Sequence, residues 1–192
     1  AMCGISGIID KSFLSVDNNK IKKINDLVAH RGPDGEGYFF KNNFAFGHRR
    51  LAIIDLSEDG SQPMNIDGYV ITYNGEIYNY LEIKEELIKL GEVFKTSSDT
   101  EVLLRSYIRW GEKCLNKFNG MWAFAIFDPI KNQIFCSRDR FGIKPFYYLS
   151  NSKHFIFGSE IKQLLPFIKV RKLNRKIAAD YLVYGFEEHT SS

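Results

Sequence analysis

Neither sign of charge dominates this sequence, and that absence weakens two classes of partner. Among its 192 residues, 26 Lys and Arg are balanced by 23 Asp and Glu, which leaves a formal net charge of +3 at pH 7. A nearly balanced surface provides no electrostatic basis for binding nucleic acid or an anionic membrane. We therefore expect neither as a partner.

Long apolar runs are also missing. The longest, Met121 to Phe127, is far shorter than the ~20 residues that a membrane-spanning helix needs. The apolar stretch after Met2 has no basic residue before it and is interrupted at Asp10, so it does not resemble a secretory signal. We expect a cytoplasmic protein.

Cysteine and histidine are too few and too scattered for a disulfide framework or a metal site. The three cysteines have unrelated spacings, and the sequence contains neither CxxC nor HExxH. It also lacks the GxxxxGK phosphate-binding loop and a Ser-Gly-Gly pyrophosphate loop. We expect no metal and no cofactor within these residues.

The sequence does contain enough apolar residues for one compact core, with 44% hydrophobic and 15% aromatic residues. Short β-rich runs separated by turn residues, with few helical patterns, indicate an α+β fold. We expect the strands between residues 37 and 74 to pair as antiparallel neighbours, and those flanking Asp128-Pro129 to form a hairpin. The expected strands are 4–9, 37–40, 44–48, 51–55, 69–74, 121–127, 133–138, 146–149 and 155–158, and a first helix covers 19–29.

Two further helices are predicted before Gly91 and before Gly111, because glycine commonly follows a helix end. The first carries an apolar stripe of Ile77, Tyr80, Leu81, Leu87 and Ile88. The second has a start signal, with Ser98 as the N-cap and Glu101 as its capping-box partner.

Cys3 directly follows Met2, which suggests the initiator methionine, and Ala1 is expected to be an addition. A single cysteine in an apolar strand is usually a small buried hydrophobe. If Met2 is removed, however, Cys3 gains a free α-amine with a pKa near ~8. This amine could act as the base for its own thiol, so no catalytic histidine would be required.

Asn74-Gly75 follows an apolar strand and has two interpretations. Asn-Gly is a strong signal for a type I′ hairpin turn. The residues after Gly75 predict the approach to a helix, so the Asn74 amide and the Gly75 N–H could instead converge on one oxygen and form an oxyanion hole.

Two charged residues could hold the ends of an amino acid. Asp99 lies in a predicted first helical turn, which favours an acid in any case, but its carboxylate could also bind an ammonium. Arg50 lies at the start of a predicted strand and is either exposed, paired with an acid, or suited to bidentate binding of a carboxylate. With Cys3, this set would suit an α-amino acid that has a reactive side-chain carbonyl.

A series of motifs in a fixed order along the chain links these candidate site residues. The sequence resembles the glutaminase domain of class II glutamine amidotransferases, the N-terminal-nucleophile type, and most closely that of glutamine-hydrolysing asparagine synthetases. The motifs that carry the resemblance are MCGI (2–5), HRGPD (30–34), RLAIID (50–55), QPM (62–64), NGEIYN (74–79), SDTE (98–101), FNGM (118–121), RDRFGIKP (138–145) and GSE (158–160).

The resemblance implies a four-layer α/β/β/α sandwich of two antiparallel sheets, the N-terminal nucleophile hydrolase fold. It covers residues 2–165, and residues 166–192 are expected to be a linker or the start of a missing C-terminal synthetase domain. The basic residues after Lys162 are expected to be a solvated helix or linker, or else a segment that docks on that domain. A homodimer is left open.

The resemblance also assigns roles in glutamine hydrolysis. Cys3 is the nucleophile, and Asn74 and Gly75 form the oxyanion hole. The implied substrate-binding residues are Arg50 for the carboxylate, Glu76 and Asp99 for the ammonium, and Ile53 and Ile54 through their backbones. Arg31 and Gly32 are expected to support the site.

The implied activity is that of an asparagine synthase (glutamine-hydrolysing), a ligase of asparagine biosynthesis. L-glutamine yields ammonia through a cysteinyl thioester, and the missing domain uses ATP and Mg to amidate aspartate. Two alternatives are an amidotransferase for a sugar or peptide acceptor and a non-catalytic glutamine-binding module.

Overall fold

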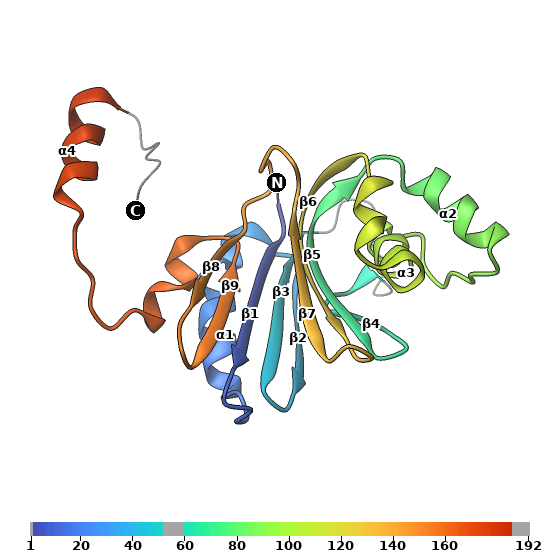
Figure 1. Cartoon of the computed structure of the whole chain (residues 1–192), viewed down its shortest axis with the longest axis horizontal. Coiled ribbons are helices and arrows are strands. Elements are labelled where there is room, and N and C mark those ends of the chain that lie inside the picture. The colour runs from blue at the N-terminus through green and yellow to red at the C-terminus, as the bar shows by residue number, and fades with distance from the viewer. Residues whose placement is uncertain (1, 52–59, 186–192) are drawn as a thin grey trace.

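The computed structural model describes residues 2–51 and 60–185, and these form two antiparallel sheets packed face to face (Figure 1). The first sheet has the strand order β2-β3-β1-β9-β8, and the second has the order β4-β5-β6-β7. The strands of the first sheet are β1 (Gly4–Asp10), β2 (Gly35–Lys41), β3 (Phe44–Arg50), β8 (Tyr147–Ser150) and β9 (His154–Gly158). Those of the second are β4 (Met64–Ile66), β5 (Tyr69–Ile77), β6 (Gly120–Asp128) and β7 (Gln133–Arg138).

Helices cover the outer face of each sheet and complete four layers. Helix α1 (Asn18–Asp26) buries Ile21 and Ile24 against the first sheet. Helix α3 (Asp99–Trp110) buries Leu103 against the second, and helix α2 (Tyr80–Lys89) packs on α3 and buries Leu87. The space between the sheets is filled by a third cluster, Ile5, Phe44, Phe46, Val70, Ala123, Ala125, Phe127 and Phe157. The predicted four-layer α/β/β/α sandwich of two antiparallel sheets is therefore confirmed.

Helix α3 starts where the sequence predicts, but its capping differs in one respect. The Ser98 side chain accepts a hydrogen bond from Thr100 N at 3.0 Å, as an N-cap should. Glu101 does not complete a capping box. Its carboxylate accepts from the backbone of Lys95 and Thr96 and pairs with Arg105 at 2.8 Å, because the loop before the helix folds back over it.

Two other expectations about elements were wrong. Of the strands expected between residues 37 and 74, β2 and β3 pair as predicted, but β5 does not join them; it pairs with β4 and β6 in the second sheet. Its apolar residues on both faces fit this position, because one face packs on α3 and the other faces the first sheet. On α2 the buried residues are Ile83 and Leu87, whereas Leu81 and Ile88 are more than half exposed.

The remaining elements contribute less to the position of the site. The hairpin of β6 and β7 is confirmed, whereas the expected strand over 51–55 falls mostly outside the described residues. Short 3₁₀ turns η1 (Ala29–Arg31), η3 (Gly111–Asn116), η4 (Ile161–Gln163) and η5 (Leu165–Phe167) connect the elements. Helix α4 (Arg175–Tyr184) lies apart from the sandwich (Figure 1). None of the helices that the structure describes is long and apolar enough to cross a membrane.

Candidate active site

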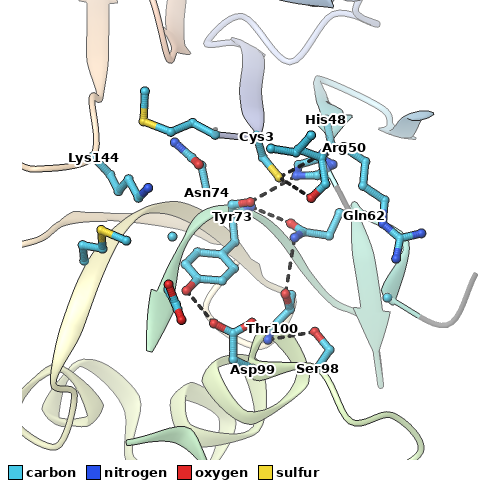
Figure 2. A pocket seen from close by; sticks show the side chains of 16 residues that line it. Cys3, His48, Arg50, Gln62, Tyr73, Asn74, Ser98, Asp99, Thr100 and Lys144 are labelled. Carbon is cyan, nitrogen blue, oxygen red and sulfur yellow. Dashed lines mark hydrogen bonds between the residues drawn. The ribbon is translucent and has the colours of Figure 1, made fainter. Parts of the chain in front are cut away.

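A pocket of about 130 Å³ lies at one end of the sandwich, where β1 begins and β3 ends (Figure 2). Within the described part of the chain, it brings together every predicted site residue: Cys3, Arg50, Asn74, Gly75, Glu76 and Asp99. The other two, Ile53 and Ile54, lie outside the described residues. Residues far apart in sequence thus converge because both sheets end at this edge.

Cys3 is placed by the pairing of β1 with β3. Because Gly4 is opposite Arg49, Cys3 lies beside the end of β3. Leu51 N–H donates to Cys3 Sγ at 3.4 Å, and the thiol in turn reaches the Leu51 carbonyl at 3.6 Å. Arg31 Nε donates to the Cys3 carbonyl at 3.0 Å, so Arg31 contacts the backbone of the cysteine.

The groups around Cys3 have opposing effects on the pKa of its thiol. Burial raises the pKa of the Cys3 thiol, and the Asp99 carboxylate adds to this effect. The hydrogen bond with Leu51 and the positive charges of Lys144 and Arg50 act in the opposite direction and lower its pKa. The site therefore contains specific groups that favour a thiolate.

Asn74 and Gly75 lie within β5, which continues to Ile77. The hairpin-turn interpretation is therefore excluded, since both residues pair with β6. The Asn74 side chain is 2% exposed, and its Nδ2 has no hydrogen-bond partner among the described residues. A buried amide donor without a partner is costly, so this nitrogen is available to a ligand that accepts a hydrogen bond in the pocket.

The Gly75 N–H points from the same edge of β5 as the N–H groups of Tyr73 and Ile77. Tyr73 N donates to Gln62 Oε1 at 2.7 Å, and Ile77 N donates to Asp99 Oδ2 at 3.0 Å. Because successive N–H groups of a strand alternate between its two edges, Gly75 N–H points the same way as these two. A Cβ on Gly75 would overlap the Met121 carbonyl oxygen, so glycine is required here.

Asp99 is held at the start of α3 with only 6% of its surface exposed. Burial raises the pKa of its carboxyl, whereas the N–H of Ile77 and the hydroxyl of Tyr73, which donates at 2.8 Å, lower it. Burial and the neighbouring carboxylate raise the pKa of Tyr73 well above its usual value, so its hydroxyl stays protonated. Asp99 is therefore a fixed acceptor on the pocket wall.

Arg50 and Glu76 provide opposite charges at the rim. Arg50 is the last residue of β3, and Glu76 is exposed on β5. A Cβ on Gly32 would overlap the backbone of Arg49 and Arg50, so the loop containing Gly32 packs directly against the base of the arginine. The pocket can therefore bind a molecule that carries both a carboxylate and an ammonium.

Several residues that line the pocket were not in the predicted site, among them His48, Gln62 and Lys144. His48 and Gln62 contact the backbone of Tyr73, through His48 Nε2 at 3.1 Å and Gln62 Oε1, and Lys144 lines the opposite wall. Gln62 and Lys144 belong to the recognised motifs, which was the only available signal. Among the described residues, no group of three His, Cys, Asp or Glu side chains could hold a metal ion.

Comparison with known proteins identifies the class. A family model described as glutamine amidotransferase domain matches residues 2–192, and the chain belongs to this family. The fold agrees: the solved glutamine phosphoribosylpyrophosphate amidotransferase from B. subtilis superposes with a TM-score of 0.71 over 84% of this chain and 43% of that one, at 22% identity.

The similar curated proteins narrow the relationship. A putative asparagine synthetase (glutamine-hydrolyzing) 2 of Methanocaldococcus jannaschii is 47% identical over 96% of this chain and 40% of its own length. Asparagine synthetase (glutamine-hydrolyzing) 3 of Bacillus subtilis is 45% identical over 88% of this chain and 29% of its own length. The predicted membership of the glutamine amidotransferase family and the predicted similarity to glutamine-hydrolyzing asparagine synthetases are confirmed, and the chain spans less than half the length of these relatives.

Proposed function

We propose that this chain is the glutaminase part of an asparagine synthetase and that Cys3, freed of Met2, is its nucleophile. The observation that carries the proposal is the pocket shared by Cys3, Asn74 and Gly75, in which the buried Asn74 amide has no described partner. The α-amine of Cys3 accepts the thiol proton, and Sγ attacks the side-chain carbonyl carbon of glutamine. A tetrahedral oxyanion results, and Asn74 Nδ2 and Gly75 N–H donate to it.

The second half of the reaction returns the enzyme to its starting state. The protonated amine gives its proton to the leaving nitrogen, ammonia departs, and a glutamyl thioester remains on Cys3. Water then hydrolyses the thioester to glutamate. Arg50 binds the α-carboxylate and Glu76 and Asp99 bind the α-ammonium, which holds the side-chain amide against Sγ. Ile53 and Ile54 contribute backbone contacts.

Met2 provides the sharpest test, because it lines the same pocket and its peptide bond occupies the nitrogen of Cys3. We expect a chain that begins at Cys3 to release ammonia from glutamine, and a chain that keeps Ala1-Met2 to release none. Intact mass spectrometry verifies each terminus, and a coupled glutamate dehydrogenase assay measures ammonia. Equal release by both chains would contradict the role of the amine.

The rival function is glutamine binding without turnover. In that case neither chain releases ammonia, and calorimetry detects glutamine binding to both. If the chain beginning at Cys3 also resists labelling by an electrophilic glutamine analogue, the proposed nucleophile is wrong.

For the complete protein, we propose that the ammonia amidates aspartate at the expense of ATP and Mg, both bound beyond the glutaminase domain of residues 2–165. Residues 166–192 would lead into that second domain. ATP consumption that depends on aspartate supports this proposal, whereas dependence on an amino-sugar precursor or a peptide would replace the acceptor. A cytoplasmic location and a homodimer remain predictions.

A further inference from the structure

The loop between β7 and β8 has an inverted exposure pattern. Phe141 is 89% exposed and Ile143 is 56% exposed, whereas Lys144 is only 7% exposed. Lysine is among the residues least often buried, unless its charge has an opposite partner. Such a local reversal of the usual pattern is expected at functional sites.

The loop backbone is held from the inside by one carboxylate. Asp139 accepts hydrogen bonds from the backbone N–H groups of Ile143 and Lys144, both at 2.9 Å, and of Phe141 at 3.2 Å. It also accepts from Trp122 N on β6 at 3.3 Å, which fixes the loop to the second sheet. The direction in which Lys144 leaves the loop is therefore determined by the fold.

Arg138 holds the loop from its other side. Its Nε donates to the Lys144 carbonyl at 2.7 Å, and its second terminal nitrogen donates to the Gly142 carbonyl at 2.5 Å. Gly142 has a φ of +64°, which favours glycine. Both the N–H and the carbonyl of Lys144 are thus held by hydrogen bonds, and its side chain extends into the pocket toward Asn74 (Figure 2).

The charges that face Lys144 come from several elements. Burial lowers the pKa of its ammonium, and the positive charge of Arg31 lowers it further. Cys3 on the first sheet, Glu76 on β5 and Asp139 in the loop act in the opposite direction. The ammonium is therefore near groups of both signs, and Cys3 becomes one of the negative groups when its thiol ionises.

We propose that Lys144 is a positioning residue of the nucleophile, one whose charge stabilises the Cys3 thiolate from across the pocket. This deepens the proposed function and rests on it. When Sγ passes its proton to the α-amine, no bond to Lys144 forms, and its ammonium lowers the energy of the negative sulfur. Arg50 acts in the same direction, Asp99 opposes both, and His48 is neutral at pH 7 because its pKa lies at about 4.

The pH dependence of Cys3 alkylation tests this role without any glutamine turnover. In the chain that begins at Cys3, the rate of carbamidomethylation by iodoacetamide is followed on the Cys3 peptide by mass spectrometry between pH 5 and 10. In Lys144→Met we expect the midpoint of this profile to rise by roughly one pH unit, the smaller end of the effect of a nearby opposite charge. Lys144→Arg keeps the charge and should restore the wild-type midpoint.

Lys89→Met is the matched control, because it removes one lysine charge from the exposed surface of α2. An unchanged midpoint in Lys144→Met, or an equal rise in Lys89→Met, would overturn the proposal. If Lys144→Met fails to give a native circular dichroism spectrum, Lys144→Gln takes its place with the same criteria. A shifted midpoint in a protein that releases no ammonia would support Lys144 while contradicting the proposed function.

Discussion

The two ends of the space between the sheets contain opposite kinds of pocket, and each has a half-buried cysteine. At one end Cys3 lies among charged and amide groups. At the other, a cavity of about 470 Å³ is lined largely by aromatic and aliphatic side chains around Cys136, with the end of β1 at its edge. The same pair of sheets therefore provides two environments for one functional group.

The two cysteines differ in whether neighbouring groups offset the effect of burial on the thiol pKa. Burial raises the pKa of Cys136 to about 12, and no charge or hydrogen bond from the described residues lowers it. Burial also raises the pKa of the Cys3 thiol, but the hydrogen bond with Leu51 and the charges of Lys144 and Arg50 lower it. A buried thiol becomes a nucleophile only where such groups stabilise its anion, so the polar end alone is suited to covalent chemistry.

Removing each sulfur in turn is the strongest way to break this comparison. We expect Cys3→Ala to lower glutaminase kcat by roughly 10⁴-fold or more, as loss of a covalent nucleophile does in other enzymes. Cys136→Ala, the matched control, should leave kcat unchanged. Ammonia release at saturating glutamine measures both. Comparable losses in the two variants would show that the polar end has no special role.

The oxyanion donor gives the next largest effect. Asn74→Ala should lower kcat by about 10²- to 10³-fold with little change in KM, because the oxyanion exists only after attack. Asn19→Ala, at an exposed position of α1, is the control for loss of an amide. Near-normal steady-state kinetics in Asn74→Ala would assign the unpartnered amide a structural role.

The sequence predicted more of the fold's elements than of their arrangement. β6 and β7 were predicted because their residue patterns and the Asp128-Pro129 turn are local signals. The sheet to which β5 belongs is decided by pairing with β6, more than 40 residues further on, which no local pattern encodes. The buried face of α2 was assigned only in part: Leu87 of the predicted stripe is buried, but Leu81 and Ile88 are exposed and Ile83 is buried instead, because α2 packs on α3, whose position no local pattern encodes.

Some residues of the site were likewise predictable from the sequence, and others were not. Cys3, Asn74 and Asp99 have residue types and neighbours that suggest their chemistry, and the family motifs assign their roles. Lys144 and His48 were missed, because an isolated lysine or histidine is usually a surface or core residue. Only the inward direction of the loop and the contact with Tyr73 place these two in the pocket.

Asp99 tests whether the polar end selects an amino acid through charge. Asp99→Asn keeps an oxygen that can accept from Ile77 N and Tyr73, so the fold should persist. Loss of the negative charge should raise the KM for glutamine about 100-fold, the size of a buried charge-assisted hydrogen bond, with a smaller effect on kcat. Asp67→Asn, an exposed turn residue, is the control. An unchanged KM would exclude Asp99 from ammonium binding.

His48 links the two sheets at the polar end, and its effect is on stability. Burial lowers the pKa of His48 from 6.5 to about 4. Between these pH values the unfolded chain binds a proton that the folded chain excludes, so stability falls as the pH falls. From pH 7 to pH 5 this amounts to about 2 kcal/mol.

His48→Gln keeps a donor for the Tyr73 carbonyl but does not titrate. Urea unfolding at pH 7 and pH 5 should therefore show a smaller loss of unfolding free energy in this variant than in the wild type, by about 2 kcal/mol. All other titratable groups are common to both proteins, so the difference isolates His48. Equal losses would mean that the imidazole is accessible to protons in the folded state, and the polar end would then be open to solvent as far as the Tyr73 backbone.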